Sequence, residues 1–132
     1  MHPSQIGPYV VEKKIGVGGM GTVFLAKHQE TGQPVAVKVL PASLAREEGF
    51  VARFNREIDA MKRLKNPHVV ELFDSGVDNE TYYYAMEYVD GETLTSRPLR
   101  EKRLPWREAV DITLQICVAL KSAHDAGIIH RD

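Results

Sequence analysis

The chain has 132 residues, enough for one domain or for one domain and part of another. Hydrophobic residues make up 43% of it and charged residues 27%, a balance that is typical of a folded globular protein and excludes an intrinsically disordered chain. The formal net charge is −1, so the overall charge gives no sign of a nucleic-acid or membrane partner.

The single cysteine and the apolar segments indicate where such a chain works. Cys117 cannot form an internal disulfide, which fits a reducing compartment. The N-terminal residues lack the apolar core of a secretory signal. No apolar run approaches the roughly 18 residues that a membrane helix needs. We therefore expect a cytoplasmic chain with no membrane segment among its residues.

The first 89 residues predict a small antiparallel sheet with one long helix. Residues 1–8 are expected to be a loose lead-in. Runs of β-forming residues between turn residues predict five strands. These lie at residues 9–15, 22–28, 35–40, 69–73 and 81–88, with a turn at 74–80. The helix is expected over residues 47–64, where apolar residues recur at the spacing of one helical face. They are Phe50, Phe54, Ile58, Met61 and Leu64.

Beyond residue 91 the sequence predicts only helices. A short helix is expected over residues 93–101. A longer one is expected over residues 105–126, because Pro105 suits a first helical turn and Gly127 suits a C-terminal cap. The apolar stripe of the longer helix consists of Ile112, Ile116, Ala119, Leu120 and Ala123. The fold class predicted is α+β, with a sheet-containing region followed by a helical one.

A glycine cluster, Gly16-Val17-Gly18-Gly19-Met20-Gly21, lies between the first two predicted strands. On its own, such a cluster is equally well explained as a flexible loop. A dinucleotide-binding site would need a helix after the third glycine, but a β-type run, Thr22-Val23-Phe24-Leu25, follows. A Walker-type loop would need Gly-Lys-Ser/Thr at the end of the cluster. This chain has Gly21-Thr22-Val23 at that place, so this alternative is excluded as well. What remains is a glycine hairpin whose backbone N–H groups can approach phosphate oxygens, with Val23 at its base to pack on an adenine.

Two charged residues lie in apolar patterns, where each needs a partner. Lys38 interrupts the apolar strand predicted at residues 35–40, although strand alternation toward solvent would also explain it. Glu57 projects only about 40° from the centre of the apolar face of the predicted helix. A buried charge without a partner costs roughly several kcal/mol. We therefore expect an ion pair between Lys38 and Glu57, which would leave the lysine positioned to reach phosphate oxygens.

Five motifs, in order and spacing, resemble those of protein kinases, most closely the bacterial Ser/Thr type. They are Gly16-x-Gly18-x-x-Gly21-x-Val23 in the glycine-rich loop, Val35-Ala36-Val37-Lys38 around the strand lysine, Glu57 in the long helix, Met86-Glu87-Tyr88-Val89-Asp90-Gly91 at the gatekeeper and hinge, and Ile129-His130-Arg131-Asp132 at the start of the catalytic loop. The resemblance covers nearly the whole chain. It implies a kinase-like N-lobe over residues 9–89, with a five-stranded antiparallel sheet and one helix, and the first helices of an incomplete C-lobe over residues 90–132.

The resemblance also implies which residues bind ATP. The loop that would cover the nucleotide consists of Ile15, Gly16, Val17, Gly18, Gly19, Met20, Gly21, Thr22 and Val23. The adenine would pack between Val23 and Ala36, with Met86 guarding the pocket behind it. Main-chain groups of Glu87 and Val89 would hydrogen-bond the edge of the adenine.

Catalytic roles follow from the same resemblance. Lys38 would hold the α- and β-phosphates of ATP, oriented by Glu57, and Asp132 would accept the proton of the substrate hydroxyl. A hydrophobic spine would be formed by Met61, Leu72 and His130. Arg131 would pair with a phosphorylated activation loop.

The sequence departs from the family pattern after Asp132. It holds neither the asparagine of the catalytic loop nor an Asp-Phe-Gly motif, so the ligands of Mg²⁺ are expected beyond Asp132. We expect ATP, Mg²⁺ and a protein with a Ser or Thr hydroxyl to be the cofactors and substrate of the full-length form. The 132-residue chain itself is expected to be inactive. The apolar stripe of its long helix would lack the cover of later helices and favour self-association.

A non-catalytic nucleotide-binding or regulatory module remains the alternative. The presence of Lys38, Glu57 and Asp132 together favours an enzyme, because a binding module has no need of a catalytic aspartate. Specificity for Ser/Thr rather than Tyr rests on the resemblance of residues 18–21 and 86–94 to bacterial Ser/Thr kinases, because the usual discriminating residues would follow Asp132.

Overall fold

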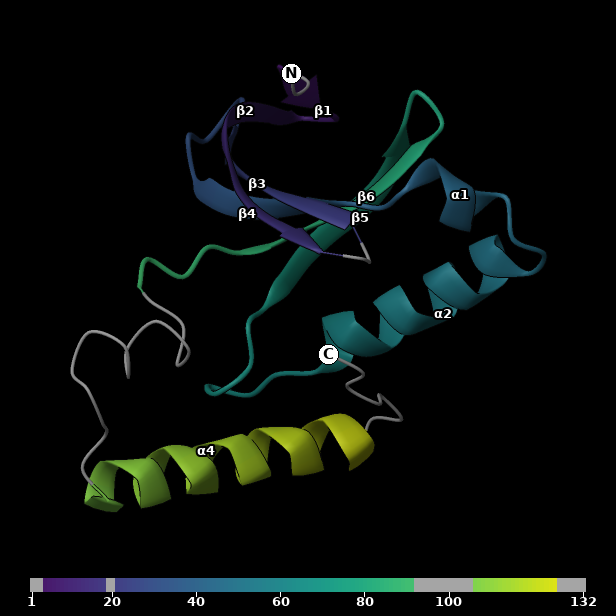
Figure 1. The fold of residues 1–132 in the computed structure, drawn as a ribbon. Coiled ribbons are helices and arrows are strands. Elements are labelled where there is room, and N and C mark those ends of the chain that lie inside the picture. The colour runs from purple at the N-terminus through teal and green to yellow at the C-terminus, as the bar shows by residue number, and fades with distance from the viewer. Residues whose placement is uncertain (1–3, 19–20, 92–105, 126–132) are drawn as a thin grey trace.

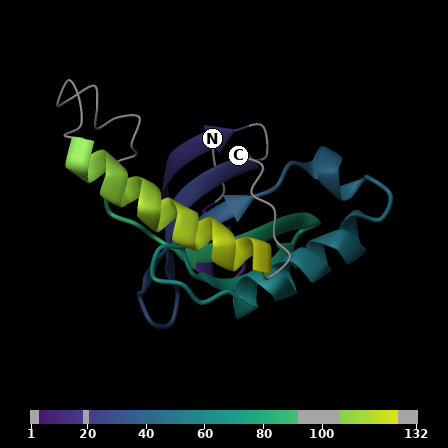
Figure 2. The ribbon, with the colours of Figure 1, turned by 90° about the horizontal axis from the view of Figure 1, so that it is seen from below.

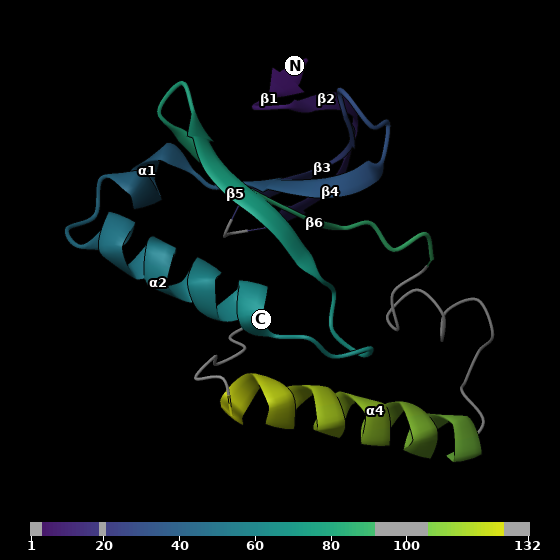
Figure 3. The same ribbon diagram turned by 180° about the vertical axis from the view of Figure 1, so that it is seen from behind.

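A computed structural model of the chain describes residues 4–18, 21–91 and 106–125 (Figure 1). Its centre is a curled six-stranded antiparallel sheet with strand order β1-β2-β3-β4-β6-β5. The strands are β1 (Gln5–Ile6), β2 (Tyr9–Gly18), β3 (Gly21–His28), β4 (Pro34–Val39), β5 (Leu72–Asp78) and β6 (Thr81–Glu87). The helices are α1 (Ala42–Ala45), α2 (Phe50–Arg63) and α4 (Trp106–Asp125). Figure 3 shows α2 running alongside β5, with α4 below both.

The predicted strands are found, but one of their boundaries is wrong. The sequence predicts a strand at 69–73 and a turn at 74–80, whereas β5 spans Leu72–Asp78 and pairs with β6 along this length. Its polar residues are tolerated because β5 lies at the edge of the sheet, where side chains reach solvent. The turn itself is confined to Asn79 and Glu80, which both have positive φ, as a two-residue hairpin of this kind requires.

The lead-in forms part of the sheet. Strand β1 pairs with β2, and Ile6 is 4% exposed in the apolar core. The N–H of Gly7 donates a hydrogen bond to Oδ2 of Asp78 at 2.7 Å. The expectation of a loose lead-in is therefore wrong for residues 5–7, and the sheet has six strands where five are predicted. Residues 1–3 lie outside the described ranges.

Alternation along the strands gives the sheet two apolar faces, each with its own core. The first core consists of Ile6, Tyr9, Val11, Phe24, Ala26, Val35, Val37, Tyr83 and Ala85. The second core consists of Phe50, Phe54, Ile58 and Leu72, with Tyr82, Tyr84 and Met86 among the partly buried residues packed against it. Strand β6 thus contributes alternate residues to both cores.

Helix α2 forms where the apolar spacing predicts it and packs through aromatic rings. It is shorter than the predicted 47–64 and begins after Gly49, which has a φ of 75°. The rings of Phe50 and Phe54 stack with centroids 5.6 Å apart. Tyr82 meets the two rings edge to face, at 5.2 and 5.3 Å. Large aromatic side chains therefore fill the space between this helix and the sheet.

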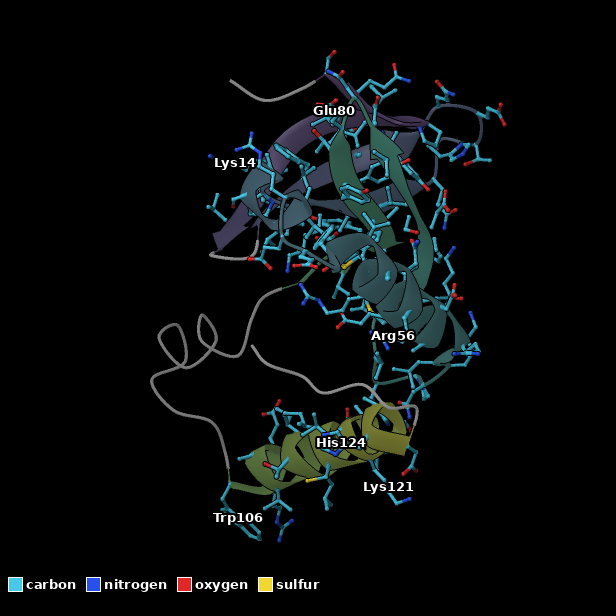
Figure 4. All side chains as sticks on the ribbon, turned by 90° about the vertical axis from the view of Figure 1, so that its right-hand side faces the viewer. Lys14, Arg56, Glu80, Trp106, Lys121 and His124 are labelled. Atoms are coloured by element: carbon cyan, nitrogen blue, oxygen red, sulfur yellow. The ribbon has the colours of Figure 1, made fainter. Side chains whose placement is uncertain are left out.

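Helix α4 confirms the long helix predicted at 105–126, but its cover is limited. Ala123 is its one buried residue, and Ile116 of the predicted stripe is 45% exposed. Exposed apolar residues continue along it, namely Trp106, Val110, Leu114 and Val118, and Figure 4 shows Trp106 pointing away from the sheet. None of the helices in the described ranges is long and apolar enough to span a membrane. The helix predicted at 93–101, Pro105 and Gly127 lie outside these ranges.

A side-chain hydrogen bond joins α4 to the loop that follows α2. Nδ2 of Asn66 donates to Oγ of Ser122 at 2.8 Å, near the point where Figures 1 and 2 bring the ends of the two helices together. The Oδ1 atom of Asn66 accepts the N–H of His68 at 2.8 Å. Both ends of the Asn66 amide are therefore used, which fixes the loop against the last turns of α4.

Tyr83 occupies a niche between two glycines in the first core. It is 5% exposed, and its ring meets that of Tyr9 edge to face at 6.3 Å. A Cβ on Gly7 or on Gly76 would collide with the Tyr83 hydroxyl. Burial raises the pKa of the Tyr83 phenol above its ordinary value of 10.0, and the charges of Asp74 and Asp78 raise it further.

We predict that part of the loss of stability above pH 10 depends on Tyr83. The phenol ionises near 10.0 in the unfolded chain but at higher pH in the folded chain, so rising pH favours the unfolded state in that window. Urea unfolding at about pH 8 and about pH 10.5 should show a smaller loss for Tyr83→Phe than for the wild type. An equal loss in the two proteins would contradict the prediction.

Candidate nucleotide-binding site

Strand pairing brings four of the predicted site residues together on one face of the sheet. Val23, Lys38 and Tyr84 are direct cross-strand partners on β3, β4 and β6. In the next row Ala36 is the partner of Met86. Direct partners in an antiparallel pair project their side chains from the same face. The lysine, the small Ala36 and the apolar Val23 and Met86 therefore share the face on which α2 packs.

The glycine cluster forms a turn between β2 and β3, as the sequence predicts. Gly18 pairs with Gly21 across it, and Gly19 and Met20 lie outside the described residues. Gly21 has a φ of 133°, and a Cβ there would collide with the carbonyl oxygen of Val39. Only glycine fits this position without strain. The hairpin leads from strand to strand, which agrees with the predicted exclusion of a dinucleotide or Walker loop.

The flanks of the glycine turn are open to solvent. Ile15 is 41% exposed and Val17 is 71% exposed on β2. Gly16 is partly exposed, as are Thr22 and Val23 on β3. The apolar side chains predicted to cover a nucleotide therefore have no protein partner that buries them within the described ranges.

The ammonium of Lys38 faces an aromatic ring. Its Nζ lies 6.0 Å from the centroid of the Tyr84 ring, within the range of a cation–π interaction. Among the residues that the structure describes, no carboxylate forms an ion pair with Lys38. The ammonium is therefore available to an anionic ligand.

The predicted ion pair between Lys38 and Glu57 is absent, so that prediction is wrong for this conformation. Glu57 is exposed on α2. The buried residues of the helix, Phe50, Phe54 and Ile58, point in a mean direction roughly 60° from Glu57 at 100° per residue. The helix thus presents its Ile58 side to the sheet, and Glu57 lies at the margin of the packed face.

The hinge predicted after β6 is only partly free to contact a ligand. The N–H of Glu87 donates to the carbonyl oxygen of Glu71 at 2.8 Å, and the N–H of Glu71 donates to Oε1 of Glu87 at 3.2 Å. Any main-chain contact of Glu87 with an adenine therefore has to use its carbonyl oxygen. Val89 is 60% exposed, and Met86 packs against the second core.

Two of the three residues predicted to form a spine meet in the second core. Leu72 is buried there, and Met61 packs against the same cluster. The third residue, His130, lies outside the described ranges together with Arg131 and Asp132. The predicted catalytic aspartate is therefore not among the described residues of the site.

The described residues suit the phosphates of a nucleotide and do not suit a metal ion. A glycine turn and an ammonium without a carboxylate partner are groups that bind phosphate oxygens. In contrast, the described ranges hold no group of three or more His, Cys, Asp or Glu residues that could bind a metal. The expected Mg²⁺ has no ligand set among them.

Two hollows in the described structure lie away from Lys38. One, of about 230 Å³, is lined by Ala109, Val110, Thr113 and Leu114 on α4. The other, of about 260 Å³, is lined by the loop after α2 together with Glu71 and Glu87. Neither hollow combines an ammonium with a glycine turn. The candidate site is therefore defined by the cross-strand partners around Lys38 and not by these hollows.

Tyr84 is the site residue that sequence reasoning missed. The alternation within residues 81–88 places Tyr84 on the same strand face as Met86, and that much could have been found. Its position beside Lys38 depends on the pairing of β6 with β4, two strands that are not neighbours in the sequence. No local sequence pattern indicates that these two strands pair.

Comparison with known proteins agrees with this geometry. The family model for the protein kinase domain matches residues 9–132. The chain is 39% identical over 124 residues to a probable serine/threonine-protein kinase of Clostridium acetobutylicum, covering 94% of this chain and 19% of that protein. It is 37% identical over 126 residues to the serine/threonine-protein kinase PrkC of Bacillus subtilis, covering 96% of this chain and 19% of that protein. The solved kinase domain of Mycobacterium tuberculosis PknI matches with a TM-score of 0.84 and 33% identity, over 100% of this chain and 56% of that chain.

The curled sheet and the glycine hairpin fit the N-lobe of a kinase domain, together with the beginning of its C-lobe. The chain belongs to the protein kinase family. The predicted family and fold class are thereby confirmed. The chain spans about a fifth of the length of the curated relatives named above, and about half of the solved kinase domain.

We predict that Gly21→Ala lowers the free energy of unfolding by roughly 2 kcal/mol or more, because its Cβ would collide with the Val39 carbonyl oxygen in a strained backbone conformation. Gly16→Ala is the matched control, since its Cβ would meet only Cβ of Val23, at 3.9 Å. Its cost should stay below about 1 kcal/mol. Chemical denaturation measures both values, and equal costs would rule out the close approach at Gly21.

Proposed function

We propose that the chain is the ATP-binding part of a protein serine/threonine kinase that transfers the γ-phosphate of ATP to a protein hydroxyl. The observation that carries this proposal is the placing of Val23, Lys38, Ala36 and Met86 on one sheet face next to a glycine turn. Apolar and small side chains beside a single ammonium suit a ligand with a flat base and a phosphate chain. Membership of the kinase family supports the same conclusion.

The site residues take their roles from this arrangement. Residues 15–23 cover the nucleotide, and Lys38 binds its α- and β-phosphates. The adenine packs between Val23 and Ala36, with the hinge at Glu87 and Val89 along its edge. Glu57 orients Lys38 only after α2 has turned Glu57 from the margin of its packed face toward the sheet. Asp132 accepts the proton of the substrate hydroxyl.

Mg²⁺ and the protein substrate enter the proposal through the family alone. The metal supplies charge stabilisation during phosphoryl transfer, and the described residues offer it no ligand set. The sequence holds no Asp-Phe-Gly motif. We therefore expect a polypeptide of these 132 residues to bind ATP without transferring its phosphate.

The domain boundaries of the chain and its cellular compartment are part of the same proposal. We place the kinase N-lobe at residues 9–89 and the partial C-lobe at residues 90–132, after a lead-in at residues 1–8. The free, exposed thiol of Cys117 suits the reducing conditions of the cytoplasm.

ATP binding tests the proposal through Lys38. Isothermal titration of the 132-residue chain with ATP should give a binding signal that Lys38→Met weakens about tenfold or more, because a charge-assisted contact with phosphate is lost. Lys27→Met is the matched control, since Lys27 is an exposed lysine paired with Glu12. Its affinity for ATP should stay at the wild-type value. Transfer of radiolabelled phosphate by this chain, lost on Lys38→Met, would overturn the expected inactivity.

A non-catalytic nucleotide-binding module is the second candidate, favoured by the absence of a Lys38–Glu57 ion pair in the structure. A polypeptide that continues through an Asp-Phe-Gly segment separates the two. Phosphate transfer that Asp132→Asn abolishes identifies an enzyme. ATP binding without transfer in that polypeptide identifies the module.

Helix α4 makes self-association part of the proposal, because its exposed apolar residues form a surface that tends to associate. We predict that amide exchange in residues 109–123 slows as the protein concentration rises, whereas exchange in β4 does not change. Leu114→Glu should remove the concentration dependence, since it puts a charge in the exposed surface. Uniformly high protection of residues 109–123 in a dilute monomer would contradict the prediction.

A further inference from the structure

Tyr84 lies beside Lys38 because the strand register requires it. The two residues are direct partners in the antiparallel pairing of β4 with β6. Lys38 has Val23 as its partner on the opposite side, toward the glycine turn. Its Nζ lies over the Tyr84 ring, 6.0 Å from the centroid. The lysine side chain thus leans toward β6 and away from the strand that carries the glycine turn.

Tyr84 also packs against the second core. It is partly buried against the second core, which contains Phe54 and Ile58 of the helix. Tyr84 therefore packs against the second core and faces the ammonium of Lys38. Glu57 of that helix is exposed, and the described residues provide Lys38 with no carboxylate.

We propose that Tyr84 is a positioning residue that holds the Lys38 ammonium over its ring in the nucleotide-free protein, in the place left by Glu57, and that bound phosphates must draw the lysine away from this ring. The inference rests on the proposed ATP site. It adds a third partner for the lysine, next to the phosphates and Glu57. The ring competes with the phosphates, because one ammonium on one strand cannot lean toward β6 and toward the glycine turn at the same time.

The expected size of the effect is small but measurable. A cation–π contact near the protein surface changes an equilibrium by about two- to fivefold. Charge-assisted bonds to phosphate oxygens are stronger, so a nucleotide at saturating concentration displaces the ring. The ring thus lowers the apparent affinity for ATP by this factor without closing the site.

The test uses ring-current shifts in the 132-residue chain. The ε-methylene resonances of Lys38, assigned by their absence in Lys38→Met, should lie upfield in the wild type and in Tyr84→Phe, which keeps the ring. They should move downfield in Tyr84→Leu. Addition of ATP to the wild type should move them in the same downfield direction. Apparent affinity for ATP should be about two- to fivefold tighter in Tyr84→Leu than in the wild type, with Tyr84→Phe nearer the wild type.

Tyr82→Leu is the matched control for lost packing. Tyr82 contacts Phe50 and Phe54 of the same helix, but its strand partners are Leu40, by a backbone hydrogen bond, and Val77. If Tyr82→Leu shifts the Lys38 resonances and the ATP affinity as Tyr84→Leu does, the position of α2 is responsible and the inference is overturned. Shifts confined to Tyr84→Leu support it.

The proposed function and this inference fail in different ways. If the wild type does not bind ATP, the proposed site is wrong, yet the upfield resonances still report the ring contact in the free protein. If ATP binds through Lys38 but the wild-type resonances lack the upfield shift, the inference alone is overturned. The measurement of the upfield shift needs only the wild type, Tyr84→Phe and Lys38→Met. It therefore still decides the inference if Tyr84→Leu does not fold.

Discussion

The antiparallel pairing of β4 with β6 is the constraint on which both the core and the candidate site depend. These strands are separated in sequence by α1, α2 and β5, yet they are neighbours in the sheet. Their register sets Lys38 beside Tyr84 and assigns alternate residues of β6 to the two cores. A slip of one residue would turn Tyr83 and Ala85 toward α2 and move Tyr84 into the first core. The burial of these residues therefore protects the geometry of the site.

The position of α2 follows from the volume of the aromatic residues beneath it. Tyr82, Phe50 and Phe54 form a cluster of rings between helix and sheet. Apolar contacts of this kind are not directional, so they determine which face of the helix is buried more strictly than its angle on the sheet. At the other end, the loop after the helix is tied to α4 through Asn66 and Ser122.

The sequence predicts most of this fold because its strands and helices carry strong local patterns. The apolar spacing of α2, the glycine hairpin and the long helix α4 are all found where expected. Errors arise where tertiary contacts override local signals. Residues 74–78 look like a turn, but pairing with β6 holds them in a strand. Ile6 looks like part of a tail, but the first core buries it. The Lys38–Glu57 pair fails because a helical wheel gives directions within a helix and not its rotation against the sheet.

The niche of Tyr83 has a consequence for how the sequence can change. Its hydroxyl occupies the space that a Cβ on Gly7 or Gly76 would need. Gly7 also has a φ of 54° and gives its N–H to Asp78, so its replacement affects the β5–β6 hairpin as well. Residues in direct contact do not contribute to stability independently. A larger residue at Gly76 fits only after Tyr83 has been replaced by a smaller one, and that first step leaves a cavity; at Gly7 the positive φ disfavours a larger residue in either case. The order in which substitutions can accumulate at Gly76 and Tyr83 is therefore imposed by packing, on the face of the sheet opposite the one that carries Lys38.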